Sequence, residues 1–206
     1  YQTERAAKVN IKVSAFPFEK TLDDFDFSYQ PSVDKTELYD LETLRFMEKS
    51  ENIIFVGTSG VGKTHLAVGI GMAAAKRRIS TYYITFNDLI NQLVQANSEN
   101  RADIKIKYFC KYKLLIIDEI GYLPITKEGA YLFFQLINKR YEKKSTIFTT
   151  NQIFSKWPDI FGDSVVTSAI IDRIVHHSHI VKINGKSYRI KDRNVEMQRN
   201  IEKEGV

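Results

Sequence analysis

The chain has 206 residues, which suits one α/β domain with a full core and is short for two. Hydrophobic residues make up 43% and charged residues 27%, an ordinary globular composition. No stretch approaches 18 consecutive apolar residues and no charged-then-apolar leader opens the chain, so neither a membrane span nor a secretory signal is expected. Cys110 is the only cysteine, which excludes an internal disulfide and favours a reducing, cytoplasmic setting.

The charge is unevenly distributed. The formal net charge is +5, yet residues 19–51 hold ten acidic side chains against four basic ones. The remainder is therefore strongly basic, and such a surface attracts a phosphate backbone. Basic surfaces also serve solubility alone, so charge by itself leaves nucleic-acid binding as one of two interpretations.

Three stretches are expected along the chain. Residues 1–18 mix charges with scattered apolar side chains and are predicted to form an arm or linker. Residues 19–190 are predicted to form the single domain, and residues 191–206 a charged C-terminal tail. Within the domain, residues 21–27 interleave apolar and acidic side chains, which indicates a short docked segment, and a helix is expected after Pro31.

From residue 53 onward, strands and helices alternate. Apolar and β-branched runs predict strands over 53–56, 81–85, 114–117 and 146–150. Helical periodicity predicts helices over 66–74, 89–94, 131–141 and 165–176, and two short strands are expected after Arg173. Strands that alternate with helices imply right-handed crossovers and a three-layer α/β fold with a parallel sheet.

A phosphate-binding loop is predicted between the first of these strands and the helix that follows. Residues 57–64 match the motif G-x-x-x-x-G-K-[ST] of P-loop NTPases. The glycines let successive N–H groups face one concavity, and the helix adds the positive end of its dipole there. Lys63 is expected to reach the β- and γ-phosphates of ATP, and the Thr64 hydroxyl to bind Mg²⁺. The expected nucleotide-binding residues are Gly57, Thr58, Ser59, Gly60, Val61, Gly62, Lys63, Thr64 and His65.

Two adjacent carboxylates follow the predicted strand 114–117, at the sheet edge where ligands of parallel sheets bind. Asp118 is expected to hold Mg²⁺, and Glu119 to orient and deprotonate the attacking water in ATP hydrolysis. Such a pair of carboxylates is common at strand ends. When it follows a phosphate-binding loop in the sequence, it indicates an ATPase. Asn151 ends the next strand and is predicted to bond the γ-phosphate or the water, with a simple turn-forming asparagine as the alternative.

The motifs resemble those of one family of P-loop ATPases. The matching stretches are TLDDFDF at 21–27, GKTHLA at 62–67, IDEIGYLP at 117–124, DRIVHHSH at 172–179 and GKSYR at 185–189. In this order they resemble the IstB family, the AAA+ ATPase helpers of IS21-type transposons and relatives of the helicase loaders DnaC and DnaI. The resemblance covers roughly residues 19–190 and implies an AAA+ ATPase domain of the initiator and helicase-loader type, without a helical lid.

The resemblance also implies a function. Such a helper oligomerises on duplex DNA with ATP sites between its subunits, remodels the DNA for a cognate IS21-type transposase, and disassembles when ATP is hydrolysed. A replicative helicase loader of the DnaC and DnaI type, with a helicase as partner and single-stranded DNA in its channel, is the alternative. A nucleotide-dependent binding module that does not hydrolyse ATP is a third. None of these readings involves a membrane.

Arg173 is implied by the resemblance as an arginine finger that enters a neighbour's nucleotide site in trans. The helix expected over 165–176 supports such a reach, because an arginine near its end can cross a subunit boundary. A surface arginine paired with Asp172 or Asp163 is the alternative. Too little chain follows Arg173 for a helical lid, so the second arginine sensor that lids carry is expected to be absent.

Three histidines follow Arg173 and invite comparison with a metal site. They are His176, His177 and His179. Adjacent histidines on a helix point about 100° apart and no cysteine or carboxylate cluster accompanies them in the sequence. They are expected to be polar residues of an interface or core.

A short basic stretch before the acidic pair is the candidate DNA contact. Its basic residues are Arg101, Lys105, Lys107, Lys111 and Lys113. Aromatic side chains interleave with them, and relatives of the initiator type insert a DNA-facing helix at this position. A solvated charged face is the alternative, and residues 76–78 are explained by a helix C-terminus. Contacts of this kind carry no base information, so binding should be sequence-independent and sensitive to salt.

Overall fold

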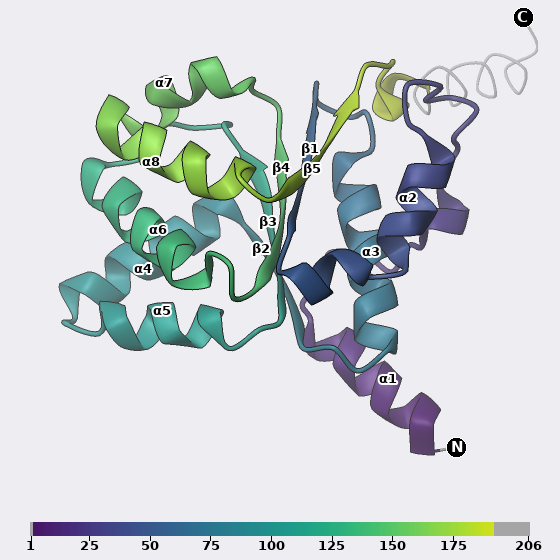
Figure 1. Cartoon of the computed structure of the whole chain (residues 1–206), viewed down its shortest axis with the longest axis horizontal. Coiled ribbons are helices and arrows are strands. Elements are labelled where there is room, and N and C mark those ends of the chain that lie inside the picture. Colours follow the sequence, from purple (N-terminus) through teal and green to yellow (C-terminus); the bar gives the residue numbers. More distant parts are fainter. Residues whose placement is uncertain (1, 192–206) are drawn as a thin grey trace, which may run out of the picture.

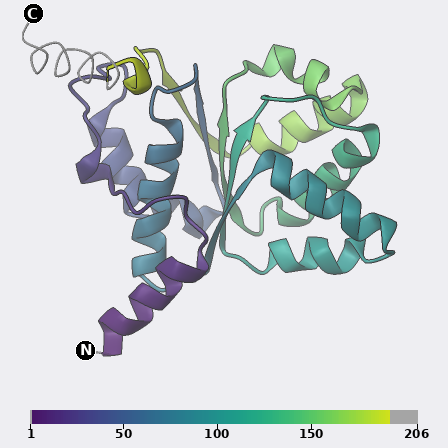
Figure 2. The ribbon, with the colours of Figure 1, turned by 180° about the vertical axis from the view of Figure 1, so that it is seen from behind.

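One parallel five-stranded sheet organises the chain, with helices on both of its faces (Figures 1 and 2). The computed structural model describes residues 2–191. The strands are β1 (Asn52–Gly57), β2 (Thr81–Thr85), β3 (Leu114–Ile120), β4 (Ser145–Thr150) and β5 (Ser178–Ile183). Their order across the sheet is β2-β3-β4-β1-β5, and every neighbouring pair is parallel. All carboxyl ends therefore meet at one edge and all amino ends at the other.

The helices divide between the two faces of the sheet. On one side lie α1 (Gln2–Val13), α2 (Lys35–Glu42) and α3 (Lys63–Lys76), with the 3₁₀ turns η1 (Leu22–Asp24) and η2 (Arg45–Lys49) (Figure 1). On the other side lie α4 (Phe86–Ser98), α5 (Ala102–Cys110), α6 (Lys127–Arg140), α7 (Trp157–Phe161) and α8 (Ser164–Val175). The turn η3 (Phe154–Lys156) precedes α7. The molecule thus has the three layers expected for an α/β fold of this class.

Side chains of the central strands feed two separate cores. Along β1, Ile54 packs with the α4–α8 side, whereas Ile53 and Phe55 pack with α2 and α3. Along β3, Leu115 packs with the α4–α8 side and Ile116 packs with the side of α2 and α3. Successive strand residues point to opposite faces, so a strand covered on both sides reads as a continuous apolar run. This explains why the central strands were predicted from uninterrupted hydrophobicity.

The predicted parallel three-layer fold is confirmed, and most differences concern the two ends of the chain. Residues 1–18, predicted as an arm or linker, contain α1, which lies against α3 and donates from the Asn10 amide to the Ala75 carbonyl at 3.5 Å. Of the two strands expected after Arg173, the described residues contain β5 alone, and residues 188–191 are helical. The charged tail lies outside the described residues beyond Lys191. None of the helices within residues 2–191 has the length and apolar character needed to cross a membrane.

Candidate functional site

The loop between β1 and α3 is shaped as a cradle at the carboxyl edge of the sheet. Gly60 and Gly62 have φ angles of 81° and 101°, a backbone conformation that side chains other than glycine rarely adopt. Gly62 is the N-cap of α3 and no side chain caps the helix, so its first N–H groups are left to a ligand. A helix N-terminus with unpaired N–H groups favours an anion such as phosphate.

The first residues of α3 face the acidic end of β3. Thr64 donates its hydroxyl to both carboxylate oxygens of Asp118, at 2.9 and 3.1 Å. Lys63 is only 6% exposed, and its Nζ donates to the Thr58 carbonyl at 2.7 Å. Burial lowers the pKa of Lys63, and the nearby Asp118 and Glu119 partly offset this effect. The lysine is therefore held beside the loop with carboxylates close by.

Asp118 is held in one orientation by three hydroxyl groups. Besides Thr64, it accepts hydrogen bonds from Tyr83 at 2.7 Å and from Thr149. Burial and the Asp118 charge raise the pKa of Tyr83, which keeps this phenol a hydrogen-bond donor. Since Asp118 is 1% exposed, its carboxylate oxygens are reserved for these donors and for a ligand beside Thr64. Sequence analysis missed Tyr83 and Thr149, because they come from β2 and β4 and meet Asp118 only in the folded sheet.

Glu119 lies in a distortion of β3 that changes where its side chain points. The pairing of β3 with β4 shifts register between Ile117 and Ile120, and Glu119 has a φ of 67°. Such a bulge re-aims a side chain that would otherwise alternate to the opposite face. The Glu119 amide donates to the Thr149 hydroxyl at 2.9 Å, which stabilises this backbone. Burial, and then the Asp118 charge, raise the pKa of Glu119, as suits a group that accepts a proton.

A cavity of about 360 Å³ lies over these residues. Its walls are the phosphate loop, the carboxyl ends of the strands, the segment 18–26 and the segment after β5. Lining side chains include Lys63, Thr64 and Glu119, so the predicted phosphate and acidic motifs meet at one hollow.

The segment after β5 brings a further arginine to the cavity. Arg189 lines it and lies 3.4 Å from the Ser59 hydroxyl through its guanidinium. Its charge partly opposes the rise in the Glu119 pKa that burial causes, and it adds to the lowering of the Lys63 pKa by burial. The arginine sensor that a helical lid would carry was expected to be absent, and that expectation stays a prediction; Arg189 reaches the cavity from the short segment after β5. The sequence signal for this arginine was the stretch GKSYR at 185–189, which resembles the IstB family. The place of Arg189 at the cavity could not be predicted, because it depends on the pairing of β5 with β1.

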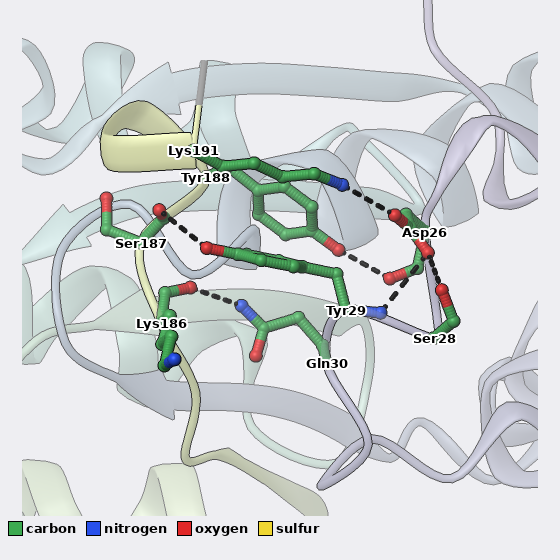
Figure 3. A network of polar contacts seen from close by, with 8 residues as sticks. All are labelled: Asp26, Ser28, Tyr29, Gln30, Lys186, Ser187, Tyr188 and Lys191. Carbon is green, nitrogen blue, oxygen red and sulfur yellow. Dashed lines mark hydrogen bonds and ion pairs between the residues drawn. The ribbon is translucent and has the colours of Figure 1, made fainter. Parts of the chain in front are cut away.

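This C-terminal segment is fastened to the N-terminal part of the domain (Figure 3). We call residues 26–32 together with 184–191 the clasp. Its contacts are Tyr29 hydroxyl to Ser187 carbonyl at 3.3 Å, Gln30 amide to Lys186 carbonyl at 2.7 Å, Tyr188 hydroxyl to Asp26 carbonyl at 2.6 Å, and Lys191 to the Asp26 carboxylate at 2.9 Å. The Tyr188 amide also donates to the carbonyl of Gly60 at 2.8 Å. The clasp thus fixes Arg189 directly against the phosphate loop.

Comparison with known proteins agrees with this arrangement. The sequence profile of the IstB-like ATP-binding proteins matches residues 1–196. The chain belongs to this family. It is 57% identical over 182 residues to the insertion sequence IS232 ATP-binding protein of Bacillus thuringiensis subsp. berliner, covering 88% of this chain and 73% of that relative. It is 43% identical over 190 residues to the insertion sequence IS21 ATP-binding protein of Pseudomonas aeruginosa, covering 92% and 72%.

Solved structures share the fold of this IstB-like protein. A crystal structure of the DnaC helicase loader superposes with a TM-score of 0.62 at 26% identity, covering 72% of this chain and 87% of that chain. The DnaI crystal structure gives 0.68 at 21% identity, covering 81% and 92%. The predicted family and the AAA+ core of the helicase-loader type are therefore confirmed.

Two predicted site residues of the IstB-like chain, His65 and Asn151, make contacts away from the phosphate and acidic groups of the site. His65 lines the cavity, but its Nε2 contacts the Thr21 carbonyl at 2.8 Å and burial lowers its pKa, so it packs the N-terminal segment against α3. Asn151 is not among the described residues that line the cavity. Its Oδ1 is buried beside Gly121 and has no hydrogen-bond partner among the described residues. The sensor role of Asn151 stays a prediction.

Arg173 lies far from the cavity of its own chain, in the last turn of α8. Its Nε donates to Asn138 at 2.7 Å and its guanidinium lies over the rings of Phe134 and Tyr141, at 5.3 and 5.8 Å. It also approaches Asp172 at 3.7 Å, the pairing that sequence analysis named as the alternative. The position fits a contact with a second copy and no contact with its own nucleotide.

Of the histidines after Arg173, His176 and His177 are exposed and His179 is half-buried. His176 and His177 gather with Glu142 so that one ligand atom of each lies within 4.8 Å of the others. The sequence argument that these two side chains diverge was wrong in geometry, because the helix ends at Val175 and their rings lie 3.9 Å apart. His177 pairs with Glu142 at 3.2 Å, and His179 with Glu51 at 2.8 Å.

The five basic residues predicted to contact DNA do not line one common hollow. Arg101 and Lys105 line a hollow between α4 and α5, whereas Lys113 lines a different one beyond α5. Lys111 lies 4.0 Å from the ring centre of Tyr108, and Lys107 is exposed on α5. A helix, α5, lies at this position, and its contact with DNA stays a prediction.

Proposed function

We propose that this chain hydrolyses ATP, assembles with further copies on duplex DNA, and prepares that DNA for the transposase of its insertion sequence. One observation carries the proposal: Lys63 and Thr64 face Asp118 and Glu119 around a single cavity. The insertion-sequence relatives support a transposase partner. Such work is done where the DNA is, so we place the protein in the bacterial cytoplasm, on the nucleoid when DNA is bound.

The chain's own groups bind and polarise the triphosphate of ATP. The N–H groups of the glycine loop and of the first turn of α3 bind phosphate oxygens, and Lys63 neutralises charge on the transferring phosphoryl group. The Thr64 hydroxyl and the Asp118 carboxylate are oxygen donors within 2.9 Å of each other, which fits the preference of Mg²⁺, and they would hold it. When bound, Mg²⁺ neutralises phosphate charge in the transition state.

Glu119 and two arginines act on the attacking water and the γ-phosphate. Glu119, with its raised pKa, takes the proton of the water. Arg189 stabilises the transition-state charge from within the same chain, and Arg173 of a second copy completes the site in trans. Asn151 orients the water or the γ-phosphate. Because the site then lies between copies, ATP binding favours the assembled state and hydrolysis releases it.

The DNA partner is inferred from charge. Outside residues 19–51 the chain is strongly basic, and α5 with its flanks carries Arg101, Lys105, Lys107 and Lys111. These residues are proposed to contact phosphates, so binding should be largely independent of sequence and should weaken with salt.

Two variants test the ATPase. Lys63→Ala should lose ATP binding, because the buried ammonium beside the phosphate loop is removed. Glu119→Gln should keep ATP binding and DNA-dependent assembly while slowing hydrolysis by roughly 10²- to 10⁴-fold. Phosphate release and binding of a fluorescent ATP analogue measure the two effects, with the exposed Glu37→Gln on α2 as the control. A Lys63→Ala chain that binds and cleaves ATP like its parent would refute the proposed site.

A helicase loader is the second candidate, favoured by the similarity to the DnaC structure. The higher identity to insertion-sequence proteins argues for the transposition helper. The two differ in partner and in DNA. A loader should bind single strands more tightly than duplex and retain a replicative helicase in pull-down, whereas the proposed helper should prefer duplex and retain a transposase.

A further inference from the structure

A second hollow lies at the edge of the sheet opposite the nucleotide cavity. Its volume is about 460 Å³, and its lining includes Arg77, Lys113, Lys143 and Lys144. Among the described residues that line it, Glu48 alone is acidic. We call these four basic residues and the hollow between them the basic pocket.

The parallel sheet brings these residues together from distant parts of the chain. Arg77 follows α3 just before β2, Lys113 immediately precedes β3, and Lys143 and Lys144 immediately precede β4. The amino ends of β2, β3 and β4 are neighbours because the strands are adjacent and parallel. The sequence analysis placed Lys113 with the α5 residues and attributed Arg77 to a helix end, so it did not associate the two.

A buried arginine braces the loops that carry the pocket. Arg140 is 2% exposed and donates to the carbonyls of Phe109, Tyr112 and Ser145 at 3.0, 2.9 and 2.6 Å, and to the Thr146 hydroxyl at 3.0 Å. It thereby ties the chain before β3 to the chain before β4. Burial lowers the pKa of Arg140 to about 10, so the guanidinium is still charged at neutral pH. None of these partners is a carboxylate, so its charge adds to the field of the pocket.

Three of the four cations of the basic pocket are lysines. Among the described residues, none offers the ammonium groups of Lys113, Lys143 or Lys144 a hydrogen bond or an ion pair. The α5 side differs, since Lys105 and Lys111 lie over aromatic rings. Arg77 is anchored by a hydrogen bond from its guanidinium to the Thr43 carbonyl at 2.6 Å.

The net charge of the pocket is clearly positive even after opposing effects. The C-terminal ends of α3, α5 and α6 point to this edge, and each contributes a partial charge of roughly −0.5. Together with Glu48, and with Glu42, which interacts with Arg77, they offset part of the positive charge of the four lining cations and Arg140, and the pocket stays positive. Lysines without a partner among the described residues, on loops that Arg140 holds in place, suit a ligand with several regularly spaced negative charges.

We propose that the basic pocket binds the phosphodiester backbone of duplex DNA. The proposal rests on the proposed function, in that it assigns DNA contact to a defined place on the edge opposite the ATP site. Contact at this edge leaves the nucleotide cavity open, so the chain can hold DNA and ATP at once. The lysines contact phosphates and read no bases, which gives affinity without sequence preference.

Two charge-matched variants of the full 206-residue chain test the assignment. One carries Lys113→Gln, Lys143→Gln and Lys144→Gln. The other carries the same change at three exposed lysines elsewhere, Lys127, Lys156 and Lys182. Binding of a fluorescent 30-base-pair duplex is measured by anisotropy at several salt concentrations with an ATP analogue present, and binding of a fluorescent ATP analogue is measured in parallel.

The pocket variant should lose about tenfold or more in duplex affinity near 0.1 M salt. Its log–log salt plot should be shallower by about 1 for each lost phosphate contact, hence by up to about 3. The control variant should keep the parent's slope, and both variants should bind the ATP analogue like the parent. Inorganic phosphate added at constant ionic strength should not displace the duplex.

Different outcomes refute different statements. If the parent binds duplex and the pocket variant matches its affinity and slope, the pocket is not the DNA site, although the proposed function stands. If inorganic phosphate displaces the duplex, the pocket is a small-anion site and the assignment to DNA is wrong. If the parent does not bind duplex at all, the DNA part of the proposed function fails and takes this assignment with it.

Discussion

At the scale of single residues, the site depends on side chains whose direction is set by their neighbours. Asp118 accepts from Thr64, Tyr83 and Thr149, three residues from three elements. Glu119 faces the cavity because β3 is distorted at that point. The sequence motifs predicted which residues form the site, and the folded sheet determines how their side chains are oriented.

Replacing Arg189 tests whether an arginine of the same chain contributes to ATP hydrolysis. Arg189→Ala should slow ATP hydrolysis roughly 10- to 1000-fold, because it removes a cation that faces Glu119 and the phosphate loop. Lys186→Ala is the matched control, since Lys186 enters the clasp through its backbone carbonyl and its side chain is exposed. Phosphate release at saturating ATP measures both variants. Equal rates for Arg189→Ala and the parent would show that the arginine has no part in hydrolysis.

The sequence predicted the residues that belong to contiguous motifs. Lys63, Thr64 and Asp118 were found because each stands at a fixed place relative to a strand end, and parallel strands share that edge. Arg189 was missed as a site residue because its place depends on β5 pairing with β1 and on the clasp. Such long-range pairing leaves no periodic signal in the local sequence.

At the scale of elements, two sets of contacts stabilise the two edges of the sheet. One is made by Arg140 at the amino edge, and the other is the clasp at the carboxyl edge. Arg140 ties the loops before β3 and β4, and its removal leaves the buried carbonyls of Phe109 and Ser145, the part-buried carbonyl of Tyr112 and one hydroxyl without their donor. Arg140→Met should therefore lower the free energy of unfolding by about 3–5 kcal/mol. The neighbouring Lys139→Met removes only an exposed ion pair with Asp103 and should cost no more than about 1 kcal/mol. Urea denaturation compares them, and equal losses would contradict the bracing role.

The clasp should respond to pH through Asp26. Hydrogen bonds from Ser28 and Lys191 lower the pKa of Asp26 from 3.8 to about 2 in the folded chain. A depressed carboxyl pKa stabilises the fold above the unfolded pKa, and this contribution is lost as the pH falls from about 4 towards 2. Asp26→Asn should therefore lower the urea midpoint at pH 7 by more than at pH 3.

The exposed Asp159→Asn in α7 is a suitable control for this titration, because it lies outside the clasp. Its midpoint should follow the parent's at every pH. A difference between Asp26→Asn and the parent that stays constant from pH 7 to pH 3 would mean that the charge of Asp26 does not hold the clasp.

Some helices and strands could be predicted from the local sequence and others could not. The central strands β1 and β3 were predicted because burial on both faces makes them uninterrupted apolar runs, whereas β4 was predicted from its β-branched residues. Helix α1 was not, because its apolar residues are scattered and it is stabilised by lying on α3. In place of the second strand expected after Arg173 lies the C-terminal segment of the clasp, whose Tyr188 packs on the rings of Phe25 and Tyr29.

At the scale of the whole molecule, Arg173 lies too far from the nucleotide cavity of its own chain to reach it. Arg173 is in the last turn of α8 and the cavity is at the carboxyl ends of the strands, so the two lie at opposite edges of the sheet. A head-to-tail contact between copies, in which different surfaces meet, brings the arginine of one copy to the cavity of the next. Hydrolysis should then require neighbours.

Mixing two inactive variants distinguishes this arrangement from a structural role. Arg173→Ala and Lys63→Ala should each hydrolyse ATP poorly on duplex DNA, the first for lack of a finger and the second for lack of bound ATP. In an equal mixture, about a quarter of the interfaces join an intact cavity of an Arg173→Ala chain to the arginine of a Lys63→Ala chain, if copies assemble at random. Activity should therefore recover to about a quarter of the parent's. Were Arg173 needed only for its contacts with Asn138 and Phe134 inside its own chain, no mixture of the two variants would regain activity, because every chain with a working phosphate loop would still lack it.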